Sequence, residues 1–337
     1  MADKRKSAAR SPKAAKQSRS AAKQPASTAK KSTGTAKKSA GTAKKPAGAA
    51  RKSAARKAAG AAPMTARAAL SVATSGRKSV DERVAALAVM PMSVCESDAD
   101  LQAVLKVLRD RDEPVEVRLA ALQTLQAASF SVIAFEPCRA DYVAALREVA
   151  EDPDPELRER ALGILARQKD GFAQTKLLAG LEDPAGALVA PEKALQLLSY
   201  DVHAEAYSAA RSIVDQPPNT AAKREALRLL AADATAAPVF ERILLDKSEL
   251  PELRQVSAAA LHSIEPDKLR EHARSILLDA SEGDEIQATS LAALTQFGDT
   301  ETVAGDRALM RRVGTLRTAA GEEVQESARL FLGRFGE

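Results

Sequence analysis

Residues Glu151–Leu165 read EDPDPELRERALGIL, and they are the clearest indication of the fold in the sequence. A turn of acidic residues and prolines precedes a segment in which apolar side chains recur every three or four positions. Proline suits the first position of a helix, and carboxylates favour the positive end of the helix dipole. The small residue Ala161 and the larger Leu165 lie four positions apart, on one face that a second helix can approach closely. The stretch therefore predicts a turn followed by an amphipathic helix.

The same pairing of a small and a larger residue returns along the chain at intervals of 31 to 40 residues. It occurs at Ala86 and Met90, Ala121 and Leu125, Ala161 and Leu165, Ala194 and Leu198, Ala226 and Leu230, Ser257 and Leu261, Ser290 and Leu294, and Ala328 and Leu332. Most copies follow a further segment of helical periodicity, and no run alternates as a half-buried strand would. We therefore predict an all-α fold, a solenoid of about seven to eight antiparallel helix pairs.

Two of these segments resemble the second helix of a HEAT repeat: Glu151–Leu165 and Asp112–Leu125, which reads DEPVEVRLAALQTL. The residues that match the family's turn aspartate and helix arginine are Asp112, Arg118, Asp152, Arg158 and Arg254. The short spacing is similar to HEAT-like repeats of the phycobilisome-lyase type. The middle repeats, at Val189–Pro191 and Ala222–Lys223, lack the aspartate and arginine. The resemblance implies a structural role for the matched residues, and it is nearly silent on function because solenoids serve many roles.

Charge divides the chain into two unlike parts. The first 78 residues carry 21 Lys and Arg against one acid, Asp3, whereas the remainder carries 29 basic residues against 44 acids. The first part is built from Ala, Lys, Ser, Thr, Arg, Gly and Pro, and such a composition cannot bury enough apolar surface to fold alone. We therefore predict a disordered basic tail over residues 1–78 and a HEAT-like solenoid over residues 79–337.

The tail's composition predicts a polyanionic partner. Unpaired lysines on a flexible chain bind phosphates by releasing condensed counterions, without sequence preference. The cations expected to make these contacts are Lys13, Lys16, Lys30, Lys31, Lys37, Lys38, Lys44, Lys45, Arg51, Lys52, Arg56 and Lys57. The segment resembles the Lys/Ala-rich tails of linker histones, which favours DNA over RNA. No bulky apolar anchors accompany the charge, so a membrane is a poorer partner. The alternatives are a solubility extension and a targeting extension.

Motifs for catalysis are missing from the sequence. The three histidines stand in no metal-ligand spacing, and HExxH, CxxC, GxGxxG and GxxxxGK[ST] do not occur. Cys95 and Cys138 are expected to be two separate thiols in a reducing cytoplasm. We therefore predict an interaction protein that is not an enzyme, with no catalytic residue, metal or cofactor, whose solenoid binds an unknown protein. The expected location is the cytoplasm, with the nucleoid if the source is bacterial. The alternative function is a HEAT-like DNA-repair glycosylase.

Overall fold

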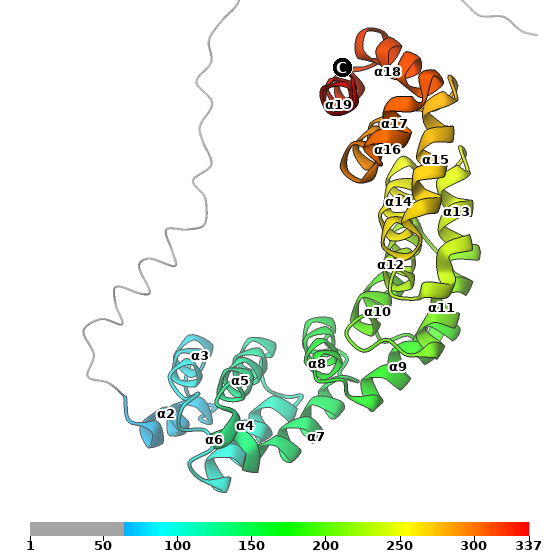
Figure 1. Ribbon diagram of the computed structural model, residues 1–337. Helices are drawn as coiled ribbons and strands as arrows, with labels where there is room; N and C mark the ends of the chain where they lie inside the picture. The colour runs from blue at the N-terminus through cyan, green and yellow to red at the C-terminus, as the bar shows by residue number, and fades with distance from the viewer. Residues whose placement is uncertain (1–63, 337) are drawn as a thin grey trace, which may run out of the picture. The chain divides into compact units, whose positions relative to one another are not determined.

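A computed structural model describes residues 64–336, and every regular element in that part of the chain is a helix (Figure 1). Successive helices pack as antiparallel pairs, so the predicted α-solenoid is confirmed. Eight such pairs, here called repeats 1 to 8, follow one another in the described residues. The twelve cations expected to contact nucleic acid lie in residues 1–63, outside the described residues.

The first helices of the eight pairs are α2 (Ala66–Ala73), α4 (Asp98–Arg109), α7 (Arg139–Val149), α9 (Gly171–Glu182), α11 (Ala204–Asp215), α13 (Ala237–Leu245), α15 (Pro266–Leu278) and α18 (Arg307–Ala319). The second helices are α3 (Val80–Ala88), α5 (Val115–Ala128), α8 (Pro155–Arg167), α10 (Pro191–Leu198), α12 (Thr220–Leu230), α14 (Pro251–Ile264), α16 (Asp284–Phe297) and α19 (Glu322–Phe335). Short elements in the connections are α6 (Val132–Phe135), α17 (Thr300–Gly305), η1 (Glu136–Cys138), η2 (Pro184–Gly186) and η3 (Ala234–Ala236).

The second helices form one continuous row, in which each helix packs against the second helix of the next repeat (Figure 1). The small residues that define the repeat lie in this row, and all of them are buried. In seven of the eight helices the small residue is the seventh of the helix, Ala161 in α8 for example. Small side chains let neighbouring helices approach closely. The larger residues four positions later, Met90 in repeat 1 and leucines in the others, are buried in all but the last repeat, where Leu332 is half-buried.

The turns between paired helices supply the residues that cap the N-termini of the second helices. In repeat 1, Ser79 and Glu82 form a capping box before α3, each side chain bonding the backbone N–H of the other residue. In repeat 3, the Asp154 carboxylate accepts from the backbone N–H of Leu157, and Pro155 is the first residue of α8. The acidic turns seen in the sequence are therefore helix caps.

The array of helices begins earlier than the sequence indicated. Helix α2 lies within the range predicted as tail, and it packs against α3 as the first helix of repeat 1. Its start is capped by Thr65, whose hydroxyl accepts from the backbone N–H of Ala68 at 3.3 Å. The predicted boundary at Ser79 thus falls inside repeat 1, because α2 is short and has only two large apolar residues, Leu70 and Val72. None of the helices in residues 64–336 has the length and hydropathy needed to cross a bilayer.

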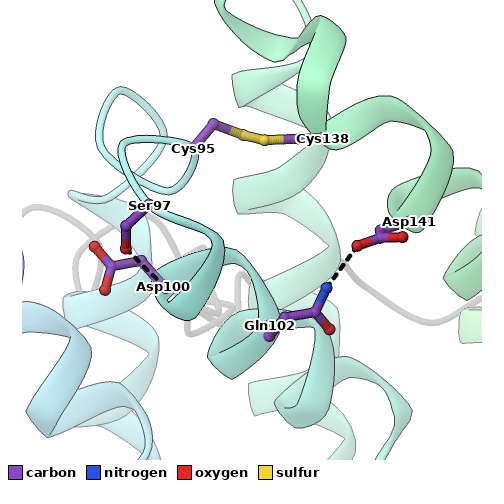
Figure 2. Close-up of a disulfide and its surroundings, with 6 residues drawn as sticks. All are labelled: Cys95, Ser97, Asp100, Gln102, Cys138 and Asp141. Atoms are coloured by element: carbon purple, nitrogen blue, oxygen red, sulfur yellow. Dashed lines mark hydrogen bonds between the residues drawn. A yellow bond between two sulfur atoms is a disulfide. The ribbon is translucent and has the colours of Figure 1, made fainter.

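The two cysteines correct another expectation. The structure joins Cys95, in the connection after α3, to Cys138, in η1 before α7, with their Cα atoms 6.3 Å apart (Figure 2). The expected pair of separate thiols is therefore wrong for this structure. Nearby, the Gln102 side chain on α4 donates to the Asp141 carboxylate on α7 at 2.6 Å. A covalent link and a hydrogen bond thus connect repeats 1, 2 and 3.

Candidate functional site at the fourth repeat

A similar ion pair connects most neighbouring repeats, and it is absent between repeats 3 and 4. We call the residues that form it the arginine ladder: Arg83, Arg118 and Arg254 with Glu113, Asp152 and Glu282. Each arginine is the fourth residue of a second helix. Its Nε donates to the last turn of the preceding first helix, and its two terminal nitrogens donate to a carboxylate in the turn of the next repeat. One side chain therefore ties three helical segments together.

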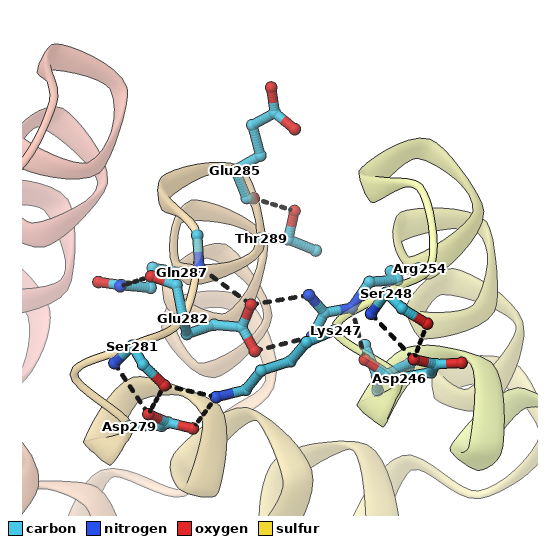
Figure 3. Close-up of polar contacts among 12 residues, drawn as sticks. Asp246, Lys247, Ser248, Arg254, Asp279, Ser281, Glu282, Glu285, Gln287 and Thr289 are labelled. Carbon is cyan, nitrogen blue, oxygen red and sulfur yellow. Dashed lines mark hydrogen bonds and ion pairs between the residues drawn. The ribbon is translucent and has the colours of Figure 1, made fainter. Parts of the chain in front are cut away.

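The geometry is nearly the same at each position of the ladder. Arg118 Nε lies 3.0 Å from the Leu108 carbonyl oxygen, and its terminal nitrogens lie 3.3 and 2.5 Å from the two Asp152 oxygens. Arg254 Nε lies 2.8 Å from the Leu244 carbonyl oxygen, and the fork reaches Glu282 at 2.7 and 2.8 Å (Figure 3). These forks match carboxylates bidentately, which is the geometry that arginine provides and lysine cannot.

Two carboxylates of the ladder, Asp152 and Glu282, are buried and are held ionised. Burial by itself raises the pKa of Asp152, but hydrogen bonds from Arg118 and from the Asp154 N–H outweigh it and lower that pKa. Hydrogen bonds from Arg254 likewise lower the pKa of Glu282. An ionised buried carboxylate without its arginine would be strongly unfavourable, so each pair fixes the spacing of two repeats.

The family residues named from the sequence have different places in this arrangement. Arg118, Asp152 and Arg254 belong to the ladder. Asp112 is exposed, and its neighbour Glu113 is the residue that pairs with Arg83 at 2.6 and 2.7 Å. The sequence missed the acidic members Glu113 and Glu282. The signal that could have found them is the recurrence of a cation at the fourth position of five of the eight second helices.

Arg158 is the fourth residue of α8 and so stands at the equivalent position in repeat 3, but it has no carboxylate to bind among the described residues. Its Nε donates to the Leu188 carbonyl oxygen at 2.6 Å, and a terminal nitrogen donates to the Asp152 carbonyl oxygen at 2.7 Å. The cause lies in repeat 4, where residues 183–190 replace the usual first turn of the second helix. Helix α10 therefore has only eight residues, and its small residue Ala194 is the fourth rather than the seventh.

Ion pairing returns after the break. Lys223, the fourth residue of α12, forms an ion pair with Glu249 in the turn of repeat 6. The sequence had indicated that Ala222–Lys223 lacks the family's polar pair, but a lysine occupies the arginine position there. Repeat 4 is thus the one interruption between repeats 1 and 7 in the described part of the chain.

The shortened helix leaves a hollow on each side. One, of about 620 Å³, lies at the replaced turn beside Leu181, Leu188, Val189 and Ile213. The other, of about 250 Å³, lies on the row of second helices, between α5, α8 and α10. We call this second hollow the Arg167 groove. Its lining residues are Gln126, Glu159, Arg160, Gly163, Ile164, Arg167, Lys193, Gln196, Leu197 and Tyr200.

The Arg167 groove is a basic spot on an acidic array of helices. Its lining carries three cations and one carboxylate. Lys193 forms an ion pair with Glu159, with 2.6 Å between the charged atoms, and Arg160 forms one with Glu156, also at 2.6 Å. The Arg167 guanidinium lies over the Tyr200 ring, 5.9 Å from its centroid, at the distance of a cation–π contact. The groove therefore offers a guanidinium to an incoming group.

No group of three His, Cys, Asp or Glu side chains in residues 64–336 is arranged to hold a metal ion. The histidines have local partners instead. His203 lies 3.1 Å from Asp201, and His272 lies 3.2 Å from Glu241. His262 stacks on Phe297 with ring centroids 3.6 Å apart.

No family model and no curated protein sequence matches the chain. Among solved structures, the chain is similar to the complex of CpcE and CpcF of phycocyanin lyase from Nostoc sp. PCC7120. The match has 15% identity and a TM-score of 0.27, and it covers 81% of this chain and 96% of that one. The prediction that the protein is not an enzyme is contradicted by this comparison, because the matched protein is a lyase. That prediction is not retained, and a match this distant assigns no lyase chemistry to the chain.

Proposed function

We propose that this protein is an interaction scaffold whose helical repeats bind a partner protein at the Arg167 groove. The groove's unneutralised guanidinium is the observation that supports this proposal most directly. It lies on the continuous row of second helices, where the ion-paired repeats on either side supply a firm frame. The site thus combines a rigid surround with a local change of shape and charge, which is the usual character of a binding site.

The experiment compares Gly163→Leu with Gly333→Leu in the full-length protein. At Gly163 an added Cβ would lie 3.6 Å from Arg167 Nη1 and 3.9 Å from Leu197 Cδ2, so a leucine side chain at this position fills the groove. At Gly333, in α19, an added Cβ meets no atom within 4 Å. Proteins recovered with the wild type but lost with Gly163→Leu are then purified and titrated. We expect the partner's Kd to rise for Gly163→Leu and to stay unchanged for Gly333→Leu. Equal binding by both variants would place the partner elsewhere.

We further propose that residues 1–78, the basic tail together with helix α2, bind nucleic acid through their charge, DNA in preference to RNA. The support is the division of charge along the sequence, with an excess of 20 positive charges in this part and 15 negative charges in the rest. An acidic array of helices repels a polyphosphate, whereas a polycationic segment releases counterions on binding one. Both parts together would bring a partner protein to nucleic acid.

The test of the tail neutralises the twelve named cations by substitution with Gln in the full-length protein. The wild type should bind unrelated duplex DNA sequences equally well. The logarithm of its affinity should fall with the logarithm of salt concentration by roughly 0.9 per phosphate contacted. The neutralised variant keeps nine of the 21 cations in residues 1–78, so its affinity should be much weaker and its slope about half as steep. Mobility shifts with DNA and RNA of the same length measure the preference. Unchanged DNA affinity in the variant would assign the binding to other residues.

A further inference from the structure

We propose that the Arg167 groove binds a carboxylate side chain carried by an extended peptide segment of the partner. This inference rests on the proposed function and adds the chemical class that the groove recognises. Arg167 is the last residue of α8, is exposed, and has no carboxylate within ion-pair distance among the described residues. Arg160 and Lys193 beside it are both already paired, so a new anion finds its donor at Arg167.

The position of Arg167 prepares it to hold an anion. Its guanidinium lies over Tyr200, which limits the conformations of a long and otherwise flexible side chain. A guanidinium fixed by one face still presents its N–H groups at the edge, and these match the two oxygens of a carboxylate. Gly163, one turn earlier on α8, lies beneath the guanidinium and leaves room for the bound group. The groove is thus built around one anion.

The rest of the lining suits a peptide. Ile164 and Leu197 are buried apolar residues of the groove, and they can contact the apolar neighbours of a carboxylate. Gln126 and Gln196 stand at the groove with side-chain amides that donate to no other described residue. Side-chain amides provide both a donor and an acceptor, which is what an extended peptide backbone requires. One charge contact, apolar contacts and amide contacts therefore fit a single short segment.

The same surroundings disfavour nucleic acid as the occupant. A phosphate backbone presents a charge at every nucleotide and gains affinity by neutralising several of them. The groove offers one unpaired cation, and the carboxylates of Glu156 and Glu159 lie close to it. A single carboxylate between apolar residues avoids this repulsion, whereas a run of phosphates meets it. Charge therefore favours a peptide.

The experiment selects peptides from a display library of random 12-residue sequences on immobilised full-length protein. We expect the enriched peptides to share one Asp or Glu next to an apolar residue. The best peptide is then titrated by fluorescence anisotropy against wild type, Arg167→Gln and Arg167→Lys. Loss of a bidentate charged hydrogen bond should weaken binding by about tenfold to a hundredfold in Arg167→Gln. Arg167→Lys should recover part of this loss, since it keeps the charge but not the fork.

The matched control is Arg228→Gln, which removes one exposed arginine from the same row of helices. Arg228 lies on α12 and is already paired with Glu225 at 2.6 Å, so its loss should leave peptide affinity unchanged. A peptide with its acid changed to amide should bind weakly to wild type and lose nothing further with Arg167→Gln. Enriched peptides without a shared acid, or an equal effect of the two variants, overturn the inference while leaving a protein-binding scaffold intact. If no peptide is enriched over Gly163→Leu, both proposals fail. If Arg167→Gln weakens oligonucleotide binding instead, the groove contacts nucleic acid and the inference is wrong.

Discussion

Repeats 2 and 4 differ in one turn, and this difference changes how the neighbouring repeats are held. Between repeats 2 and 3, Arg118 spans from the Leu108 carbonyl to the Asp152 carboxylate, and both charged groups are buried. Between repeats 3 and 4, Arg158 reaches only backbone carbonyls, because the longer turn brings Leu188 where a carboxylate would stand. A few residues in a turn thus replace an ion pair by neutral hydrogen bonds, and hollows open beside the shortened helix.

A solenoid tolerates a binding site where the loss of one ion pair weakens only one interface between repeats. In a repeat array each repeat contacts only its neighbours, so stability is approximately a sum of local terms. A buried ion pair fixes one interface, and its loss at a single interface leaves the others intact. Repeat 4 can therefore depart from the pattern and open a groove while the repeats around it stay in register.

The largest expected effect comes from removing Arg118, and removal of Arg158 provides the contrast at repeat 4. Arg118→Ala leaves the buried Asp152 carboxylate with only the exposed Arg111, 3.9 Å away, as a cationic partner. It should destabilise the interface by an amount near the lower end of about 3–5 kcal/mol. Arg158→Ala removes bonds to neutral carbonyls from a half-buried side chain and should cost about 1–2 kcal/mol. Urea unfolding measures both, and hydrogen exchange of α5 and α8 assigns the loss to its interface.

A double variant, Arg118→Met with Asp152→Leu, serves as the control for this first prediction. Because it removes both charges together, it should recover much of the stability lost in Arg118→Ala. Equal losses for Arg118→Ala and Arg158→Ala would mean that the ion pair contributes nothing beyond its hydrogen bonds. The interface between repeats 2 and 3 would then differ from that between repeats 3 and 4 in shape but not in stability.

The second prediction concerns the covalent link at the regular end of the array. The disulfide closes a loop of 43 residues between repeats 1 and 3, whereas no such link reaches repeat 4. By the chain-entropy relation, Cys95→Ser should destabilise the oxidised protein by about 2–4 kcal/mol. Reducing agent should lower the stability of wild type and leave Cys95→Ser unchanged. If wild type is equally stable with and without reductant, the link does not contribute in solution.

The fold could be predicted from the sequence because each repeat is specified by patterns among residues close together in the chain. Ala161 and Leu165 and their equivalents recur with helical spacing, and the caps at Asp154 and Pro155 mark where the helices begin. These signals depend on neighbours within one helix, so they can be recognised without coordinates. The start at Ala66 was missed because α2 has few large apolar residues.

The candidate site could not be predicted in the same way, because its residues meet only through stacking of repeats. Nothing near Arg167 in the sequence indicates that Tyr200 lies beneath it. Nor does the sequence indicate that the neighbouring cations are already paired with Glu156 and Glu159. The choice of Glu113 over Asp112 likewise depends on which side chain points toward Arg83. The departure at Val189–Pro191 was visible in the sequence, but its consequence for the groove required the packing of α8 against α10.

The third prediction uses pH to weaken the ladder without changing a residue. The pKa of Asp152 is lowered in the folded state, so its stabilising contribution is present above the usual value of 3.8 and is lost as pH falls through the lowered pKa. Glu282 behaves in the same way from its usual 4.5. The effect should be smaller than that of Arg118→Ala, since Arg118 keeps its bond to Leu108. Urea midpoints between pH 7 and pH 2 measure it. Asp152→Asn should be less stable at pH 7 and should lose less on acidification; an unchanged pH profile would contradict the assigned pair.

The smallest expected effect is a gain of stability at the break itself. Glycine in a helix interior costs roughly 0.5–1 kcal/mol relative to alanine. At Gly163 a Cβ would make ordinary contacts with Arg167 at 3.6 Å and Leu197 at 3.9 Å, so Gly163→Ala should raise the free energy of unfolding by about that amount. Gly333→Ala, where a Cβ meets open space, gives the propensity effect alone. If Gly163→Ala gains as much as Gly333→Ala or more, and the peptide nevertheless binds it less well, then glycine at this position favours binding over stability. A loss of stability in Gly163→Ala would instead mean that the helices at repeat 4 pack more tightly than the groove implies.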